Sequence, residues 1–352
     1  MRTSKAVLIA ASLMGMLGAA APTPSSPDLT PRLPLPFDGH LSVLTYNIHG
    51  LPWPVARGRT QAFAQIVQHL RTMREDGTQP HIIVLQEAFT TDARAIGRAA
   101  GYRYVVEGPG AQMPGQGNLP SGSHALTDAA AWYHGETLGK YVGSGLQILS
   151  DYPIAGVRKM AFPTFACAGF DCLANKGALL VSVALPGQWD RVDIVTTHLN
   201  SRRASRVQDD RSLAAYRLQV DYLTNFITSA HDPSRPLIVA GDFNVGSVPA
   251  RKQMLLSRAQ SRWCQDGDID DAYGEAARHG IALSADARFS RKRARDWQFF
   301  TPGRRTDLEL SSIDVPFGHE PDGTMLSDHV GYSATYQLRN RQPLTRIAPG
   351  RV

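Results

Sequence analysis

The sequence is poor in cysteine, which limits the metal and redox chemistry that it can perform. Only three cysteines occur in 352 residues, Cys167, Cys172 and Cys264. A structural zinc site is disfavoured, because the Cys167/Cys172 pair supplies too few ligands and no neighbouring Cys or His completes a set. If the protein is exported, these two cysteines can instead close a small disulfide loop, which would leave Cys264 free.

Other common sequence features are also missing. No glycine-rich fingerprint follows the first expected strand, which argues against dinucleotide binding. The sequence has no obvious internal repeat, no convincing interdomain linker and no second long apolar segment after the N-terminal one. We therefore expect a mature protein that is soluble and exported.

The N-terminal residues combine a basic start, an apolar stretch and a small-residue end, which is typical of a secretory signal peptide. A transmembrane anchor is the alternative, but the apolar run is short and is followed by Pro and Ser. The formal charge of +6 includes Arg2 and Lys5, so the mature protein is only modestly basic, which favours an anionic substrate or surface. We expect a signal peptide at 1–21, an extended leader at 22–39, one domain at 40–340 and a C-terminal tail at 341–352, with a secreted or periplasmic location.

Strand-like and helix-like segments interleave along the chain without alternating strictly. Several of the expected strands are joined by short turns, so the pattern favours an α/β sandwich with mixed sheets over a doubly wound parallel sheet. Strands are expected at 41–50, 81–89, 144–154, 176–185, 191–200 and 236–245, and helices at 60–76, 91–101 and 212–230.

Five strand-like segments end in polar residues. A single Asn or Asp after a strand is a common turn residue, and a lone His is more often structural than catalytic. Five such positions together, with carboxylate, amide and imidazole groups, instead indicate a metal-assisted reaction at the edge of a sheet. The residues are Asn47, Glu87, His198 and Asn200, Asp242 and Asn244, and Asp328 and His329.

These side chains suit a divalent cation that acts on a phosphate ester. Glu87 is the best protein ligand for Mg²⁺, with Asn47 and Asp328 beside it, because this cation prefers hard oxygen ligands. Mn²⁺ and Co²⁺ are the alternative cations. Asn200 could help to bind the phosphate and is the weakest candidate of the set.

The remaining residues suit proton transfer and the stabilisation of charge. His329 directly follows an acid and can act as a general base near neutral pH. Asp242 and Asn244 are two positions apart and face the same way on an extended strand end, so they can orient the attacking water and the phosphoryl oxygens. His198 can donate a hydrogen bond to charge that builds on the phosphate.

The order of these motifs resembles that of the endonuclease/exonuclease/phosphatase superfamily, which has the DNase-I-like fold. The series Asn, Gln-Glu, Thr-His, Gly-Asp-x-Asn and Ser-Asp-His extends from about residue 41 to 338, and "GDFNV" and "LSDH" are its most specific pieces. The resemblance implies Mg²⁺-dependent phosphoester hydrolysis and a four-layer αββα sandwich, with two mixed β-sheets packed face to face and helices outside. It also implies an Asp that orients the catalytic His. "DWQFF" is similar to the strand that carries it, so Asp296 is the candidate, with Asp307 and Asp314 as alternatives.

Residues 167–183 favour a phospholipid substrate within this superfamily. "DCLANKGALLVSV" resembles the Asp and Lys-Gly element of neutral sphingomyelinases, which implies that Asp171 and Lys176 shape the substrate site. A surface salt bridge is the alternative for this pair, and it would contribute little energy. The resemblance implies hydrolysis of sphingomyelin, or of a related phospholipid, to ceramide and phosphocholine.

A few apolar residues fit a lipid interface. Trp53 in "LPWPV", and Met113 and Leu119 in the Gly/Pro-rich loop at 108–130, suit a membrane boundary, whereas packing of Trp53 in the core is at least as consistent with the sequence. The expected partner is therefore a phospholipid at a membrane surface, and no protein partner is inferred.

A secreted Mg²⁺-dependent nuclease is the competing interpretation. The basic segments 201–206 and 288–297 can bind nucleic-acid phosphates without sequence preference, although a solvated loop would have the same composition. A scaffold or toxin subunit that has lost activity is a third alternative, and the complete set of polar residues argues against it.

Overall fold

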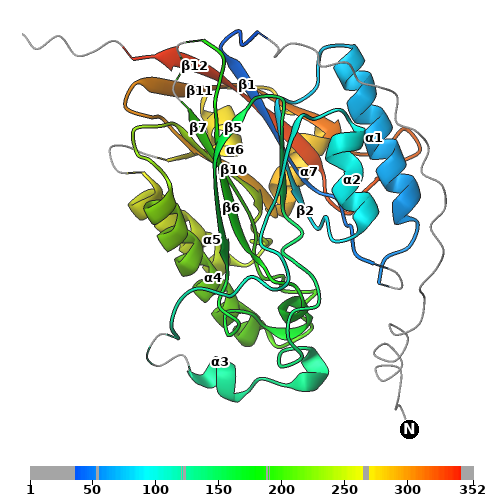
Figure 1. Ribbon diagram of the computed structural model, residues 1–352, viewed down its shortest axis with the longest axis vertical. Coiled ribbons are helices and arrows are strands. Elements are labelled where there is room, and N and C mark those ends of the chain that lie inside the picture. Colours follow the sequence, from blue (N-terminus) through cyan, green and yellow to red (C-terminus); the bar gives the residue numbers. More distant parts are fainter. Residues whose placement is uncertain are drawn as a thin grey trace, which may run out of the picture. The chain divides into compact units, whose positions relative to one another are not determined.

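Two six-stranded β-sheets form the centre of the structure, a computed structural model that describes residues 36–52, 55–119, 121, 124–187, 189, 191–264 and 269–341 (Figure 1). The expected signal peptide, most of the expected leader, Trp53 and the residues after 341 lie outside the described part of the chain. Within the described part, no helix has the length and apolar character needed to cross a membrane.

The first sheet has the strand order β11-β12-β1-β2-β4-β3. Its two central strands, β1 and β2, run parallel, and its other neighbouring pairs are antiparallel. The strands are β1 (His40–Asn47), β2 (Ile82–Gln86), β3 (Tyr104–Glu107), β4 (Gln147–Ser150), β11 (Thr306–Phe317) and β12 (Gly331–Asn340).

The second sheet has the strand order β5-β6-β7-β8-β10-β9. Here β7 and β8 form the parallel pair, so both sheets are mixed. The strands are β5 (Ile154–Ala161), β6 (Gly177–Val183), β7 (Val192–His198), β8 (Leu237–Asp242), β9 (Asp270–Asp271) and β10 (Asp296–Thr301).

The central strands are rich in apolar residues on both faces because both faces are buried. In β1, Leu41 and Val43 pack between the two sheets, whereas Leu44 and Tyr46 belong to the cluster on the outer face. Successive residues of a strand point to opposite faces, so one continuous apolar run supplies two separate cores. The same division occurs in β8, where Ile238 and Ala240 face the other sheet.

Helices cover the outer face of each sheet (Figure 1). The first sheet is covered by α1 (Arg59–Glu75) and α2 (Thr91–Ala99), and the second by α4 (Asp209–Ala230) and α5 (Pro249–Arg258), which continues into the π-helical turn η3 (Ala259–Trp263). The predicted four-layer αββα sandwich is therefore confirmed. The short helices are α3 (His124–Asp128), η1 (Trp132–His134), η2 (Gly169–Leu173), α6 (Ala272–Arg278) and α7 (Ala285–Arg293).

Candidate functional site

The register of the second sheet aligns three of the candidate residues. Asp242, the last residue of β8, pairs with His198 at the end of the parallel strand β7. On its other side, Asp242 pairs with Asp296 at the start of the antiparallel strand β10. Three neighbouring strands thus present His198, Asp242 and Asp296 in one row at one edge of the sheet, as expected from the strand-end motifs.

The first sheet contributes Asn47 and Glu87 to the same place. Asn47 ends β1, and its Nδ2 donates to Glu87 Oε1 at 3.0 Å and to Asp242 Oδ2 at 3.0 Å. One amide therefore joins a carboxylate from each sheet. Its Oδ1 accepts the His49 backbone N–H at 3.0 Å, so both ends of the Asn47 amide are engaged.

The backbone is strained where these strands end. Glu87 and Asn244 have φ values of 60° and 49°, in the left-handed region that non-glycine residues rarely occupy. Gly50 is required beside them, because a Cβ at this position would lie 2.2 Å from the Glu87 carbonyl oxygen. Tight turns of this kind cost energy and aim particular side chains, which is typical of functional sites.

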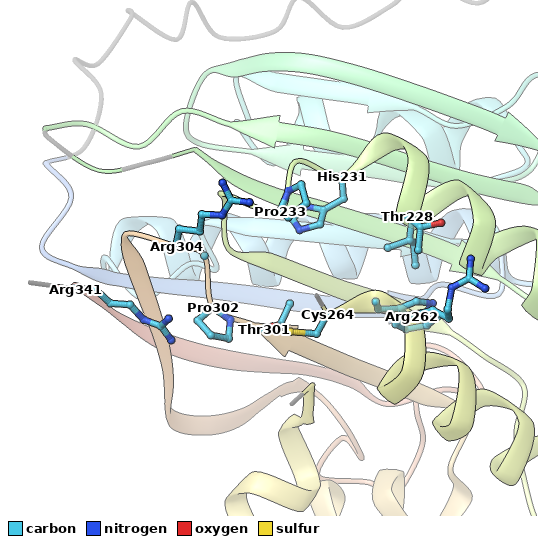
Figure 2. Close-up of a pocket in the computed structure, with 12 residues that line it drawn as sticks. Thr228, His231, Pro233, Arg262, Cys264, Thr301, Pro302, Arg304 and Arg341 are labelled. Atoms are coloured by element: carbon cyan, nitrogen blue, oxygen red, sulfur yellow. Dashed lines mark hydrogen bonds between the residues drawn. The ribbon is translucent and has the colours of Figure 1, made fainter. Parts of the chain in front are cut away.

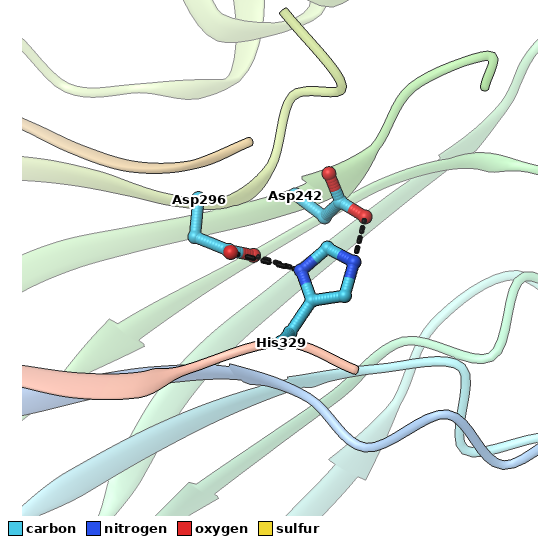
Figure 3. A group of neighbouring side chains, drawn as sticks. All are labelled: Asp242, Asp296 and His329. Atoms are coloured by element: carbon cyan, nitrogen blue, oxygen red, sulfur yellow. Dashed lines mark hydrogen bonds and ion pairs between the residues drawn. The ribbon is translucent and has the colours of Figure 1, made fainter. Parts of the chain in front are cut away.

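His329 lies between two carboxylates (Figure 3). Its Nδ1 is 2.8 Å from Asp296 Oδ2, and its Nε2 is 3.7 Å from Asp242 Oδ2. Burial alone lowers the pKa of His329, but the negative charges of Asp296 and Asp242 outweigh this effect and raise the pKa to about 9. Asp296, rather than Asp307 or Asp314, is thus the carboxylate that contacts His329.

The carboxylate of Glu87 fits a bound cation. Its Oε2 is buried without a hydrogen-bond partner in the described structure, although burial of an unpaired polar atom is costly. Burial is also the main reason why the pKa of Glu87 is raised, while the hydrogen bond from Asn47 lowers it. Asp242, Asp296 and His329 place ligand atoms within 4.8 Å of one another nearby. The carboxylate oxygens of Glu87, Asp242 and Asp296 are hard donors, which match a divalent cation such as Mg²⁺.

His198 is buried and neutral at physiological pH. Burial is the main cause that lowers its pKa to about 3, and the charge of Lys176 adds to this effect. Its Nε2 lies 3.4 Å from Asp242 Oδ2, and its Nδ1 is buried without a partner among the described residues. A neutral imidazole can still donate one N–H to an anionic oxygen.

The carbonyl oxygen of Leu199, next to His198, connects Asn244 to the Asp171/Lys176 pair. It accepts Asn244 Nδ2 at 3.0 Å and Lys176 Nζ at 3.0 Å. Lys176 Nζ also lies 2.9 Å from Asp171 Oδ2. Both side chains of this ion pair are largely buried, so it is not the solvated surface salt bridge considered as the alternative. Cys167 and Cys172 form a disulfide that closes a short loop containing Asp171.

Asn200 does not contact the row of catalytic candidates. Its side chain is fully buried. Its Oδ1 accepts the Ala168 N–H, and its Nδ2 donates to Ser201 O and Ser212 Oγ. The geometry therefore fits a residue that holds loops together better than the expected contact with phosphate.

Asp328 contacts two basic side chains rather than Glu87. His49 Nδ1 lies 3.0 Å from Asp328 Oδ1, and Arg295 Nη1 lies 3.4 Å from Oδ2. Burial raises the pKa of Asp328, but the hydrogen bond from His49 and nearby positive charges outweigh burial and lower it well below its usual range. The expected role beside Glu87 as a metal ligand therefore has no direct contact to support it in this structure.

Two residues at the site, His49 and Arg295, were not expected from the sequence. Arg295 Nη1 is 3.3 Å from His329 Nε2, so a guanidinium faces the nitrogen that points toward Asp242. Their positions in the sequence contain a signal, because His49 follows Asn47 by two residues and Arg295 directly precedes Asp296. Only the fold brings both side chains to Asp328.

Two surface cavities are lined by residues outside this cluster. A cavity of about 170 Å³ sits at the other end of β10 and is lined by Thr301, Cys264 and three arginines (Figure 2). The second, of about 530 Å³, is lined by residues between 51 and 63 together with Thr90 and Asp92. None of the catalytic candidates lines either cavity, so the site is built on the edge shared by the two sheets.

Comparisons with known proteins agree with this geometry. The sequence profile of the Endonuclease/Exonuclease/phosphatase family matches residues 44–329. A sphingomyelinase of Mycobacterium tuberculosis strain H37Rv is 22% identical over 238 residues, covering 68% of this chain and 40% of that protein. The chain thus spans about two fifths of the length of the curated relatives it matches.

Solved structures share the fold at low sequence identity. Sphingomyelinase C from Streptomyces griseocarneus has a TM-score of 0.54 and 19% identity, covering 84% of this chain and 99% of its own. A mutant beta toxin from Staphylococcus aureus with bound magnesium ions has a TM-score of 0.56 and 15% identity, with coverage of 84% and 98%. TDP2 from D. rerio, complexed with a single strand DNA product, has a TM-score of 0.54 and 15% identity, with coverage of 85% and 99%.

These structural matches show the fold, and the profile, which spans most of the chain, shows the family. The expected resemblance is confirmed on both counts. The chain belongs to the endonuclease/exonuclease/phosphatase family, whose members hydrolyse phosphodiester bonds.

Proposed function

We propose that the protein is a Mg²⁺-dependent phosphodiesterase that hydrolyses sphingomyelin, or a related phospholipid, to ceramide and phosphocholine. The observation that carries this choice is the buried Asp171/Lys176 ion pair, which is fixed to the Leu199 carbonyl beside His198. The pair follows the Asp and Lys-Gly spacing of neutral sphingomyelinases. Relatives named sphingomyelinase, at 22% identity, also support it.

The residues around His329 suit the activation of water. Asp296 fixes the imidazole by accepting the hydrogen bond from Nδ1–H. In the cation-free protein a pKa of about 9 keeps His329 protonated at neutral pH, so Nε2 takes a proton from water only in the deprotonated form, which alkaline pH or a nearby bound cation would favour. Asp242 faces that nitrogen and can accept a hydrogen bond from the same water. The Asn244 backbone N–H holds the Asp242 carboxylate by donating to Oδ1 at 2.9 Å.

The bond changes balance without a covalent enzyme intermediate. The water oxygen bonds to phosphorus, and the bond between phosphorus and the ceramide oxygen breaks. The proton removed from water passes to His329 and is later returned to the leaving alkoxide or to solvent. His198 Nε2–H can donate to the charge that accumulates on the phosphoryl oxygens during this step.

Glu87, with Asn47 beside it, would hold the cation. When bound, Mg²⁺ supplies positive charge that polarises the phosphate and stabilises the leaving oxygen. Mn²⁺ and Co²⁺ are the alternative cations for the same donors. We also propose that residues 1–21 direct export, so that the enzyme meets its lipid outside the cytoplasm or in the periplasm.

One pair of assays separates this function from its main alternative. The purified protein is incubated with sphingomyelin liposomes and, separately, with supercoiled plasmid DNA, each with Mg²⁺ or with EDTA. We expect Mg²⁺-dependent release of phosphocholine and no nicking of the plasmid. Nicking without phosphocholine release would overturn the proposal.

The secreted nuclease remains the second candidate because of Arg293 and Arg295. Arg293 donates to the Asp328 carbonyl oxygen, and Arg295 lies beside Asp328 and His329, so two cations flank the catalytic candidates. Such a pair can bind a nucleic-acid phosphate as well as a lipid phosphate. A nuclease would lose affinity for DNA as the salt concentration rises, and Arg293→Ala would weaken that binding and make its salt dependence shallower, whereas a phospholipase-C-type enzyme would not bind the plasmid.

A further inference from the structure

The structure exposes a group of large apolar side chains that its fold does not cover. Five of the eight large hydrophobic residues that are exposed in the described chain come from two short segments, residues 132–141 and η2. Their exposed fractions lie between 39% and 66%. Isolated exposed apolar residues are normal, but a concentration of them marks an interaction site. We call these residues the aromatic surface: Trp132, Tyr133, Leu138, Tyr141 and Phe170.

Hydrogen bonds hold the two segments of the aromatic surface together. The buried Glu136 carboxylate accepts the Ala131 N–H and the Gly169 N–H, both at 2.8 Å, and Arg211 Nε at 2.7 Å. The Tyr141 N–H donates to the Leu173 carbonyl at 2.8 Å. The exposed rings are therefore held on a fixed backbone, so little ordering entropy would be lost when they bind.

Gly135 allows the close approach of these segments. A Cβ at this position would lie 3.3 Å from Phe170 and 3.2 Å from Leu173, and the backbone has a φ of 82°. Phe170 consequently lies against the η1 segment and forms part of the same surface as Trp132 and Tyr133, whose rings are in edge contact. In Figure 1, this part of the chain, around α3, lies at the lower end of the domain.

The aromatic surface is linked through the chain to residues of the candidate site. Phe170 directly precedes Asp171, whose Oδ2 contacts Lys176 Nζ at 2.9 Å and accepts the Ser201 N–H. Lys176 in turn donates to the Leu199 carbonyl, next to His198. A partner that binds the aromatic surface would therefore place its outermost groups close to the strand ends that carry the catalytic candidates.

Most of the charged side chains near this surface are paired with one another, and Lys140, within the first segment, donates to the Cys172 carbonyl oxygen at 2.8 Å. Glu136 is paired with Arg211, Asp171 with Lys176 and Arg202 with Asp209. The guanidinium of Arg206 lies 6.0 Å from the centre of the Phe170 ring, as a cation above an aromatic face. What remains exposed is rich in Trp and Tyr, whose rings are apolar with one polar group and favour the boundary between hydrocarbon and water.

We propose that the aromatic surface is the face by which this protein docks on a zwitterionic phospholipid bilayer, with the catalytic strand ends turned toward the lipid head groups. Aromatic rings can also contact the quaternary ammonium of a choline head group through cation–π attraction. The inference rests on the proposed lipid function and adds the surface that delivers the enzyme to its substrate. Trp53 lies outside the described residues, and Met113 and Leu119 of the 108–130 loop expected from the sequence are only partly exposed.

The test compares binding to vesicles with turnover of a water-soluble substrate. The variant Trp132→Ser/Tyr133→Ser/Tyr141→Ser is measured in EDTA for partition onto phosphatidylcholine/sphingomyelin vesicles by flotation. In Mg²⁺, it is measured for hydrolysis of bis(p-nitrophenyl) phosphate. We expect partition to fall by more than about tenfold, because three rings lose burial at the interface, while turnover of the soluble ester stays within about twofold. Val157→Ser, an exposed apolar residue of the edge strand β5, is the control that should change neither.

Unchanged partition of the triple variant would overturn the proposal. So would light scattering that shows a dimeric wild type and a monomeric triple variant, because a second copy would then cover the surface. If the triple variant fails to fold, wild-type tryptophan quenching by brominated lipids replaces it, with Trp132→Phe as the comparison. Quenching that Trp132→Phe leaves unchanged would also refute docking here. Wild-type partition through these residues without lipid hydrolysis would refute only the proposed function.

Discussion

The two ends of β7 carry buried Asp–His pairs that differ in one respect. At the start of the strand, Asp193 lies 3.0 Å from His231 Nδ1, and its carboxylate also accepts Ser182 Oγ–H at 2.6 Å, Arg235 Nη1–H at 3.5 Å and the Asp232 N–H at 3.2 Å. At the other end, His198 lies in the row with Asp242, near His329. There, His198 Nδ1 and Glu87 Oε2 remain without partners among the described residues.

The difference separates a structural Asp–His pair from a reactive one. A buried carboxylate with all of its lone pairs occupied is stable and has no capacity left for a ligand. A buried cluster with unpaired atoms and a strained backbone is costly, and the missing contacts can be supplied by a cation, a water or a phosphate. The same residue types therefore support stability at one end of β7 and chemistry at the other.

Replacing His329 should have the largest effect on activity. His329→Ala removes the only group of the cluster that can both accept the proton from water and be held by Asp296, so turnover should fall by about 10³-fold. Steady-state kinetics on the hydrolysed substrate measure this loss, and circular dichroism should show an intact fold. His279→Ala, an exposed histidine paired with Glu275, is the matched control. A variant with unchanged turnover would refute the proposed base.

Replacing His231 should instead affect stability. His231→Ala leaves the buried Asp193 carboxylate with a smaller set of partners, so the free energy of unfolding should fall by about 3 kcal/mol. Urea denaturation measures the change. The turnover number at a temperature where the variant is folded should stay near that of the wild type. A loss of turnover comparable to that of His329→Ala would contradict the assignment of a purely structural role to the Asp193/His231 pair.

Cation binding should stabilise the catalytic end through Glu87. At a cation concentration about 100-fold above the dissociation constant, the gain is about 2.7 kcal/mol, seen as a rise in melting temperature that EDTA abolishes. Glu87→Gln should lose this rise, because it removes the negative charge of a carboxylate whose Oε2 has no hydrogen-bond partner among the described residues. Asp307→Asn, at an exposed carboxylate paired with Arg341, should keep it. A full cation response in Glu87→Gln would place the cation elsewhere.

Asp296→Asn should lower the pKa of His329 in the cation-free protein. Removing the nearest negative charge weakens the interaction that raises this pKa to about 9, so the imidazole should titrate about one pH unit lower or more. The folded-state pKa of His329 lies above its ordinary value of about 6.5, so proton uptake by His329 stabilises the fold, fully at pH values below about 6.5. This contribution is lost as the pH rises through 9.

NMR titration of the histidines in EDTA measures this change, with Asp314→Asn as the control in β11. The pH dependence of unfolding should follow the titration, so that the variant loses its stabilising proton at a lower pH than the wild type. A His329 pKa that is equal in the two proteins would mean that Asp296 does not hold the imidazole.

The sequence contained enough information for the sandwich and for most of the row at the sheet edge. The motifs sit at strand ends, and in parallel strands such as β7 and β8 these ends meet at one edge, so His198 and Asp242 had to be neighbours once the strands paired. The choice of Asp296 came from the resemblance of "DWQFF", and the antiparallel register of β10 against β8 places this residue beside Asp242. Asp307 and Asp314 lie in β11, which pairs with β12 in the other sheet.

What the sequence could not provide was the direction in which side chains point within loops. Asn200 stands two residues after His198, yet its amide is turned inward to Ser201 and Ser212. Arg295 looked like one member of a basic run, and only the turn before β10 brings it to His329. The aromatic surface was missed for the same reason, since Trp132 is the kind of residue that packing usually buries.

The strand order of the first sheet brings together segments from distant parts of the sequence. β1, the first strand, lies between β2 and β12, the last strand of the described chain. Asn47 is the last residue of β1, and His329 lies two residues before β12. During synthesis, β1 has no second neighbour until β12, residues 331–340, has emerged, and non-local pairing of this kind forms late. A chain that ends before residue 329 thus lacks both the proposed base and the closed sheet, so we expect no hydrolysis before β12 has been added.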